Sequence, residues 1–185
     1  GGRPLSGAKG TMLEGGGLVP LIVNWPGVTP ANEVADDLID SSDFMPTFAS
    51  LAGAKLPAET TIDGHDFLPR IRGEQGRPRR WVFIQLAGMW YVREAGWKLN
   101  QAGELFDMSG APFTEKRVSA DSQDPTAQAA RARLQTVLAQ LDPAGGIRDD
   151  GDGTVCSAQY VRPTTRASHP AAPHFFGARG IYPHH

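Results

Sequence analysis

The first strongly hydrophobic segment of the chain is a nearly continuous apolar run. Leu18–Trp25 carries only one strongly polar residue, Asn24, and is closed by Pro26 and Gly27. A run of this length without alternation is typical of a strand buried on both faces of a parallel sheet. Pro20 lies near its start, where a missing N–H is tolerated better than at a strand centre. The pattern predicts one strand of an α/β domain.

A helical spacing begins at Asp43. Asp43 can cap the helix, and Pro46 then falls at the third helical position, where the N–H has no partner inside the helix. The apolar residues that share one helical face are Phe44, Phe48, Leu51 and Ala52. Gly53 is expected to end the helix. A polar, basic stretch at 73–80 follows, and we place a domain boundary there.

From residue 81 the pattern changes to short strands separated by glycine-containing turns. The expected strands are Trp81–Leu86, Met89–Arg93, Trp97–Asn100 and Leu105–Asp107. Their close spacing predicts the hairpins of an antiparallel meander. A helix is then expected from Pro125 to Leu141, capped by Asp124 and carrying one apolar stripe. We expect this helix to lie across one face of the sheet.

The end of the chain has a different composition. Residues 145–185 contain no Leu and no Lys, but they hold four of the five histidines. They lack the residues that build a core, so an extended or disordered tail is expected. The predicted division is therefore 1–72 as the end of an α/β domain, 73–144 as a small α+β subdomain, and 145–185 as the tail.

Charge and composition exclude several classes of protein. Eighteen basic and twenty acidic residues give a net charge of -2, with no sustained run of either sign, so neither nucleic acid nor a membrane is expected as a partner. The apolar run is far shorter than the roughly 20 residues of a bilayer span. A single cysteine, Cys156, excludes an intrachain disulfide framework. The first residue, Gly1, is not methionine, and we expect the chain to be a piece of a longer protein.

The glycine-rich opening carries the first candidate for chemistry. Lys9 lies between Gly7 and Gly10 in a loop whose backbone can approach an anion. Its ammonium can hold a sulfate or phosphate oxygen as a point charge, and the alternative is an ordinary solvated lysine. The nucleotide-binding signature G-x-x-x-x-G-K-[ST] is not present, because Gly10 follows the lysine directly.

Six sequence landmarks occur in order between residue 1 and about residue 142. They are K-G-T-M-L-E-G-G at 9–16, V-P-L-I-V with W-P-G at 19–27, D-F-M-P-T with L-A-G at 43–53, I-D-G at 62–64, V-R with W-K-L at 92–99, and E-L-F-D-M at 104–108. Together they resemble the later part of the sulfatase family, the arylsulfatase-like members of the alkaline phosphatase superfamily. The tail has no counterpart in this resemblance.

The resemblance implies a fold and an activity. The fold is the end of an alkaline-phosphatase-like α/β domain followed by a small antiparallel sheet with a packed C-terminal helix. The activity is that of a sulfuric ester hydrolase, which acts on a sulfate-ester substrate. Family members use a formylglycine nucleophile, a divalent cation, usually calcium, and Lys and His side chains that bind the sulfate. A periplasmic or secreted location is also implied.

Of the family's site residues, only the late lysine has a counterpart in this chain. It corresponds to Lys9, which the resemblance makes a catalytic and substrate-binding residue. The formylglycine nucleophile and the calcium ligands are expected in a missing N-terminal catalytic part, before Gly1. No metal ligand is therefore assigned within the chain, and the chain alone is expected to be inactive and to bind neither group.

Further candidates carry less of the family pattern. His65 and Asp66 occupy positions where relatives often have an uncharged residue and serine. His65 is therefore a second substrate-side candidate, with a plain surface turn as the alternative. Cys156 begins a formylglycine-like C-S-A sequence, but Tyr160 occupies the place that needs arginine, so no nucleophile is assigned.

Two other groups in the tail contain residue types that can bind metal ions. The acidic residues Asp149, Asp150 and Asp152 lack the glycine and glutamate positions of an EF-hand. The histidines of the tail lack the H-x-x-x-H spacing of a helical zinc site. They are His169, His174, His184 and His185.

Two other functions stay open. A lysine recognises either oxyanion, so a phosphoester or phosphonate hydrolase of the same superfamily is the first alternative. The second is a non-catalytic remnant or subunit that acts as a binding module.

Overall fold

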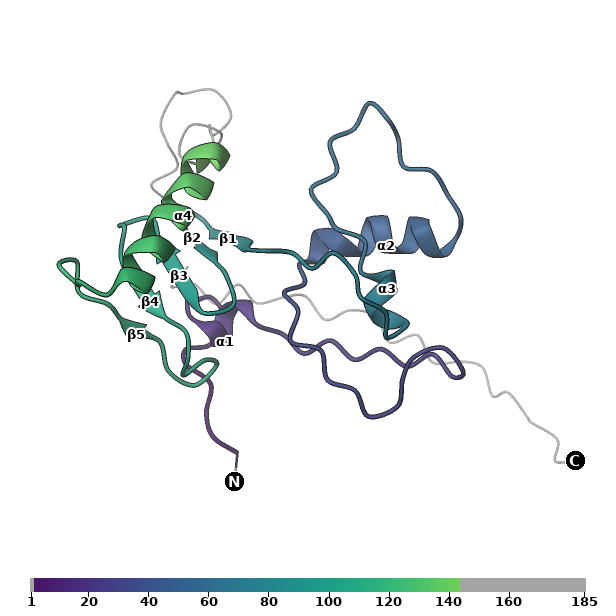
Figure 1. The fold of residues 1–185 in the computed structure, drawn as a ribbon, viewed down its shortest axis with the longest axis horizontal. Coiled ribbons are helices and arrows are strands. Elements are labelled where there is room, and N and C mark those ends of the chain that lie inside the picture. Colours follow the sequence, from purple (N-terminus) through teal and green to yellow (C-terminus); the bar gives the residue numbers. More distant parts are fainter. Residues whose placement is uncertain (1, 144–185) are drawn as a thin grey trace, which may run out of the picture.

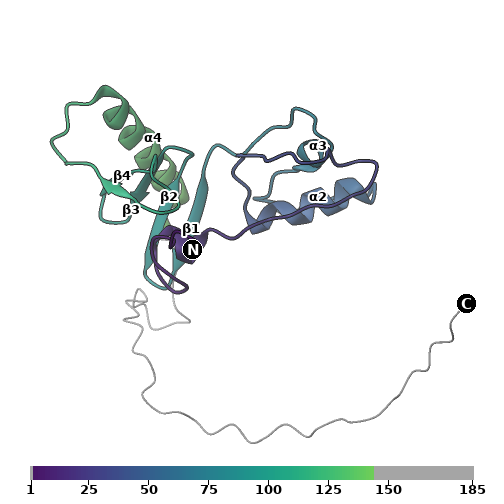
Figure 2. The same ribbon diagram turned by 90° about the horizontal axis from the view of Figure 1, so that it is seen from below.

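The computed structural model describes residues 2–143. The predictions for the tail, including those for Cys156 and the aspartates and histidines, lie outside this range. Figure 1 shows an antiparallel sheet beside one long helix, and a second group in which two shorter helices lie next to each other. The view from below in Figure 2 shows the same separation between the sheet and the two shorter helices.

The sheet is a five-stranded antiparallel meander. Its strands are β1 (Val82–Leu86), β2 (Met89–Arg93), β3 (Trp97–Asn100), β4 (Leu105–Asp107) and β5 (Lys116–Arg117), in the spatial order β1-β2-β3-β4-β5. The predicted bounds of β2, β3 and β4 are confirmed, and β1 begins one residue later than predicted. β5 was not predicted, because two consecutive exposed cations show no strand alternation.

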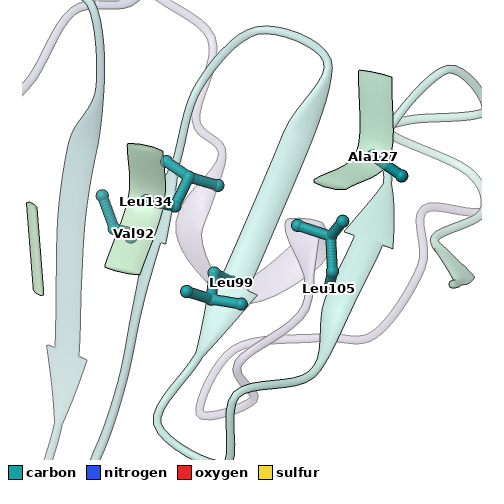
Figure 3. Close-up of a cluster of buried hydrophobic side chains, with 5 residues drawn as sticks. All are labelled: Val92, Leu99, Leu105, Ala127 and Leu134. Carbon is teal, nitrogen blue, oxygen red and sulfur yellow. The ribbon is translucent and has the colours of Figure 1, made fainter. Parts of the chain in front are cut away.

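The long helix α4 (Pro125–Leu141) covers one face of the sheet, as predicted. Asp124 caps it by accepting the backbone N–H of Thr126 at 2.9 Å, with Pro125 in the first turn. The core lies between this helix and the sheet (Figure 3). Its buried residues are Val92, Leu99 and Leu105 from the strands and Ala127 and Leu134 from the helix. The predicted apolar stripe of α4 therefore packs on this face of the sheet.

The opposite face of the sheet is covered by the N-terminal segment. Side chains alternate along a strand, so Tyr91 and Lys98 point away from the face that α4 covers. The short helix α1 (Glu14–Gly17) lies on this side. A Cβ added at Gly17 would lie 2.6 Å from the Tyr91 hydroxyl and 2.9 Å from Ile84 Cδ1. The glycine therefore lets the backbone of α1 approach the sheet closely.

The second group of elements is built around a short helix. The 3-10 turn η1 (Ser41–Asp43) runs into α2 (Phe44–Leu51), which packs against α3 (Leu68–Ile71). Asp43 precedes α2 as predicted, but its carboxylate does not cap this helix. It accepts the backbone N–H groups of Asp40, at 2.8 Å, and His65, at 2.6 Å. The sequence predicted the helix correctly and the role of this side chain wrongly.

The prediction of a buried strand at Leu18–Trp25 is wrong. These residues form no strand, and Val19 and Ile22 are 76% and 88% exposed. A strand needs a neighbour to accept and donate its backbone hydrogen bonds, and no strand in residues 2–143 pairs with this segment. The outward face of α2 is also exposed, with Phe48 at 61%.

None of the helices within residues 2–143 is both long enough and apolar enough to cross a bilayer.

Candidate functional site

Lys9 lies at the tip of a tight turn. The Thr11 N–H donates to the Ala8 carbonyl at 3.0 Å, which closes a four-residue turn with Lys9 in second place. Gly10, in third place, has φ 84°, the left-handed conformation that a type II turn requires there. The Thr11 hydroxyl also bonds the Ala8 backbone, at 2.7 Å to its carbonyl. The Lys9 side chain is exposed and makes no ion pair with any residue from 2 to 143.

The turn belongs to a closed loop, which we call the Lys9 loop and define as residues 6–17. Its two ends meet where the Gly15 N–H donates to the Ser6 carbonyl at 2.7 Å. The interior is filled by backbone: a Cβ at Gly15 would lie 2.5 Å from the Gly7 carbonyl oxygen, and one at Gly16 would lie 2.0 Å from that of Thr11. The glycines of the E-G-G sequence are therefore required by packing within the loop.

Four charged side chains fasten the loop to the sheet, and we call them the buried charge cluster: Glu14, Arg93, Lys98 and Glu115. Glu115 pairs with Lys98, and these side chains are only 2% and 3% exposed. Arg93 Nε lies 3.1 Å from Glu14 Oε1, although this N–H makes no hydrogen bond within residues 2–143. The cluster contains two cations and two carboxylates, so its formal charge is balanced.

Two members of the cluster also bind the backbone of the loop. Glu115 Oε1 accepts the Glu14 N–H at 2.9 Å. Lys98 Nζ donates to the Met12 carbonyl at 3.2 Å, and it lies over the rings of Tyr91 and Phe106 at 4.9 and 5.1 Å from their centroids. The sheet thus holds the main chain of the loop three to five residues after Lys9.

The burial of this cluster changes its acid-base behaviour. Burial raises the pKa of the Glu14 carboxyl above its ordinary value, and the nearby charge of Arg93 opposes that rise. Burial also raises the pKa of the Tyr91 phenol, with the charges of Glu14 and Glu115 acting in the same direction. Tyr91 therefore stays neutral in the folded protein at ordinary pH.

The second predicted site residue, His65, lies in the other group of elements. It precedes α3, its side chain is exposed, and its backbone N–H donates to Asp43. Within residues 2–143 no hydrogen bond or shared cavity joins His65 to Lys9. The structure therefore does not bring the two candidates together, and the substrate-side role of His65 stays a prediction.

Cavities and metal-ligand clusters add no further site to the described residues. One hollow of about 200 Å³ lies on the surface between α4 and the segment before it, lined by residues such as Ser122 and Arg131. No three His, Cys, Asp or Glu side chains from 2 to 143 gather in a way that could hold a metal ion.

The sequence did contain a signal for the buried charge cluster. Arg93 and Lys98 are directly opposite each other in the β2–β3 pair. Like charges in that arrangement are unfavourable unless carboxylates lie between them. The predicted hairpin therefore requires two acidic side chains that neutralise Arg93 and Lys98. Sequence alone could not say that they are Glu14 and Glu115, because both lie outside the hairpin.

Comparison with known proteins finds similarity to sulfatases. Residues 8–91 match the family model described as N-sulphoglucosamine sulphohydrolase, C-terminal. Arylsulfatase A of Bos taurus is 30% identical over 171 residues, which cover 74% of this chain and 33% of the relative. Steryl-sulfatase of Mus musculus is 36% identical over 111 residues, which cover 57% of this chain and 18% of the relative.

A solved structure is similar as well. A 2-O GAG sulfatase superposes with a TM-score of 0.52 at 25% identity, over 69% of this chain and 31% of that one. The structure contains the antiparallel sheet with its packed helix and is similar to a sulfatase, so the predicted fold class is confirmed. The resemblance to the C-terminal part of the sulfatase family, which the sequence landmarks indicated, is confirmed. The chain spans a third or less of the length of these relatives.

Proposed function

We propose that Lys9 supplies a positive charge to the sulfate group of the substrate in a sulfuric ester hydrolase. One observation carries this proposal: an exposed ammonium, without an ion-pair partner among residues 2–143, stands on a turn whose backbone is fixed by hydrogen bonds and glycine packing. The turn begins where the match to the sulfatase family model begins, at residue 8. A surface lysine on a frayed terminus would have none of these constraints.

The chemistry follows from the charge. When a sulfate ester is cleaved, negative charge develops on the leaving oxygen and stays on the sulfate oxygens. An ammonium held in advance near those oxygens stabilises that charge without having to reorganise during the reaction. Lysine presents a compact point charge with three donors, so its contact does not depend on one planar geometry.

Calcium and formylglycine are the groups that the family resemblance implies. The described residues do not fit a calcium site, since no three acidic or imidazole side chains come together among them. No step of the proposal therefore passes through either group. We assign both to the part of a sulfatase that lies outside residues 2–143.

An exposed apolar surface indicates a partner that belongs to a sulfatase as well. Leu18–Val23 and the outward side of α2 present aliphatic and aromatic side chains to solvent, among them Ile22 and Phe48. Monomeric proteins seldom leave such a surface uncovered. We propose that it packs against the rest of a sulfatase catalytic domain. The periplasmic or secreted location stays a proposal from the resemblance.

Binding of inorganic sulfate tests the role of Lys9. The 185-residue chain is titrated with sodium sulfate at constant ionic strength, and the amide signals of the Lys9 loop are followed by NMR. A single exposed charge should give a weak dissociation constant, on the order of 0.1 M. The shifts should disappear in Lys9→Gln and persist in Lys55→Gln, a matched variant of another exposed lysine.

Two results would contradict the proposal. One is an equal response of wild type and Lys9→Gln, which would show that the sulfate effect does not involve Lys9. The other is a complete absence of response in wild type. Titration with phosphate in the same experiment distinguishes a general oxyanion site from one that prefers sulfate, and a stronger phosphate response would favour a phosphoester hydrolase.

A further inference from the structure

We propose that Glu115, together with Lys98, is a positioning residue for Lys9: the pair holds the backbone of the Lys9 loop against the sheet and so fixes where the ammonium stands. This inference rests on the proposed role of Lys9 in binding sulfate. It concerns the loop's backbone, so it can be tested without any sulfate present.

The geometry distinguishes this pair from an ordinary buried ion pair. Each carboxylate oxygen of Glu115 has its own partner, with Oε1 on the Glu14 N–H and Oε2 on Lys98. Lys98 in turn donates to the Met12 carbonyl. The two side chains therefore bind an N–H and a C=O of the same short segment, one donating and one accepting. Such contacts fix a main chain whatever side chains the loop carries.

The segment that carries Glu115 also reaches the other end of the loop. The Ser6 N–H donates to the Pro112 carbonyl at 2.9 Å, and the Arg3 guanidinium lies 4.6 Å from the centroid of the Phe113 ring. Ser6 also accepts the N–H of Gly15. Both ends of the loop are thus fastened to residues 112–115, and the turn that presents Lys9 lies between these two attachments.

Burial explains why these contacts can hold the loop in place. Glu115 and Lys98 are almost completely removed from water, so water cannot replace the hydrogen bonds that they make to the loop backbone. If Glu115 is lost, the Glu14 N–H loses its acceptor and Lys98 is left as an unpaired buried charge. Water can then reach these two groups only if the loop moves away from the sheet.

Amide exchange measures the loop directly. The readout is the exchange rate at Thr11 and Gly15, whose N–H groups close the loop, relative to Leu99 in the sheet. In Glu115→Leu we expect the loop amides to exchange about tenfold faster relative to Leu99. Glu115→Gln keeps an oxygen for the Glu14 N–H, so it should restore part of the protection. Arg133→Gln, which removes the exposed pair with Glu94, is the control and should change neither rate.

Each outcome decides the question. Faster exchange confined to the loop, with partial rescue by glutamine, supports the proposal. Exchange that rises equally in the loop and the sheet would show a general structural role and overturn it, as would no change in the loop. If Glu115→Leu does not fold, Glu115→Gln is judged by the same comparison of loop and sheet, with a smaller loop-specific rise as the supporting result.

A second measurement separates this inference from the proposed function. Glu115→Leu should also weaken the sulfate-induced shift at the Lys9 amide, and Glu115→Gln should retain more of it. If wild type shows no sulfate response while the exchange result is as expected, the positioning of the loop stands and the sulfate role of Lys9 fails. A normal sulfate response in Glu115→Leu would overturn the positioning role.

Discussion

Arg79 forms an ion pair with Asp43 across 36 residues of sequence, and the two side chains are only 8% and 2% exposed. Arg79 also donates to the Asp63 carbonyl at 3.0 Å. Asp43 accepts two backbone N–H groups in addition, those of Asp40 and His65. This one contact therefore joins η1, the turn before α3 and the segment that leads into β1. The conspicuous aspartate of the D-x-x-P-T sequence holds the helical group together.

Replacing Asp43 should unfold the helical group. Asp43→Ala leaves Arg79 as an unpaired buried charge and removes the acceptor of two backbone N–H groups. Breaking a buried pair in this way costs about 3–5 kcal/mol, and we expect α2 to lose its amide protection while Leu99 in the sheet keeps its own. Asp63→Ala, at an exposed position nearby, is the control. Undiminished protection of α2 in Asp43→Ala would contradict this account.

Lowering the pH should partly destabilise the same helical group. Burial opposes ionisation of Asp43, but the hydrogen bonds from Arg79, Asp40 and His65 outweigh it and lower the pKa of this carboxyl below its ordinary 3.8. A depressed pKa in the fold contributes stability above pH 3.8 that is lost as the pH falls through the folded value. Amide exchange of α2 measured from pH 5 to about pH 2 should show this loss. Asp43→Asn should show less dependence on pH over the same range.

Ionisation of Glu14 should make the stability of the fold depend on pH in the opposite direction. Its pKa is raised by burial above 4.5, so between 4.5 and the folded value the native state binds more protons than the unfolded chain. Stability must then fall as the pH rises through this window. The free energy of unfolding in urea, measured from about pH 4.5 to 8, should decline in wild type relative to Glu14→Gln. A constant difference between the two would show that the Glu14 carboxyl titrates normally.

The fold could be predicted from the sequence wherever one local pattern determines one element. The stripe of α4 and the glycine-separated strands each bury a face within the small sheet and its helix, so period and turn chemistry were sufficient. Leu18–Trp25 has an equally clear pattern, but a strand requires a partner, and periodicity gives no information about whether one is present. The same limit applies to Asp43, because its cap position is local and its actual partner, Arg79, is 36 residues away.

The same distinction between local and long-range features applies to the candidate site. Lys9 was found from its glycines and from the family resemblance, and both are local features. The groups that hold its loop, Lys98 and Glu115, are 86 and about 100 residues away from the backbone atoms that they bind. The opposition of Arg93 and Lys98 across the hairpin indicated only that acidic partners were needed, not that Glu115 is one of them. Side chains that act across the fold leave little trace in a single sequence.

The core between α4 and the sheet should be sensitive to truncation. Leu134 is 1% exposed and packs on Val92 and Leu99, so Leu134→Ala should lower the free energy of unfolding by about 2–5 kcal/mol. Leu141→Ala removes the same atoms from a position that is 39% exposed near the end of the helix, and it should cost less than 1 kcal/mol, roughly the value for partial burial. Urea unfolding followed by tryptophan fluorescence compares the two. Equal losses would mean that Leu134 is not part of a close-packed core.

The exposed segment at Leu18–Val23 offers the sharpest test of the proposed partner surface. Ile22 is 88% exposed, so Ile22→Asp loses almost no burial and should leave the free energy of unfolding within about 0.5 kcal/mol of wild type. It should nevertheless reduce binding of a hydrophobic dye and self-association, because it places a charge in the middle of the apolar surface. Val34→Asp, equally exposed but outside this segment, is the matched control. If the two variants reduce dye binding equally, the segment has no special role. If Ile22→Asp unfolds the protein, the side chain is buried in solution and the surface is already occupied.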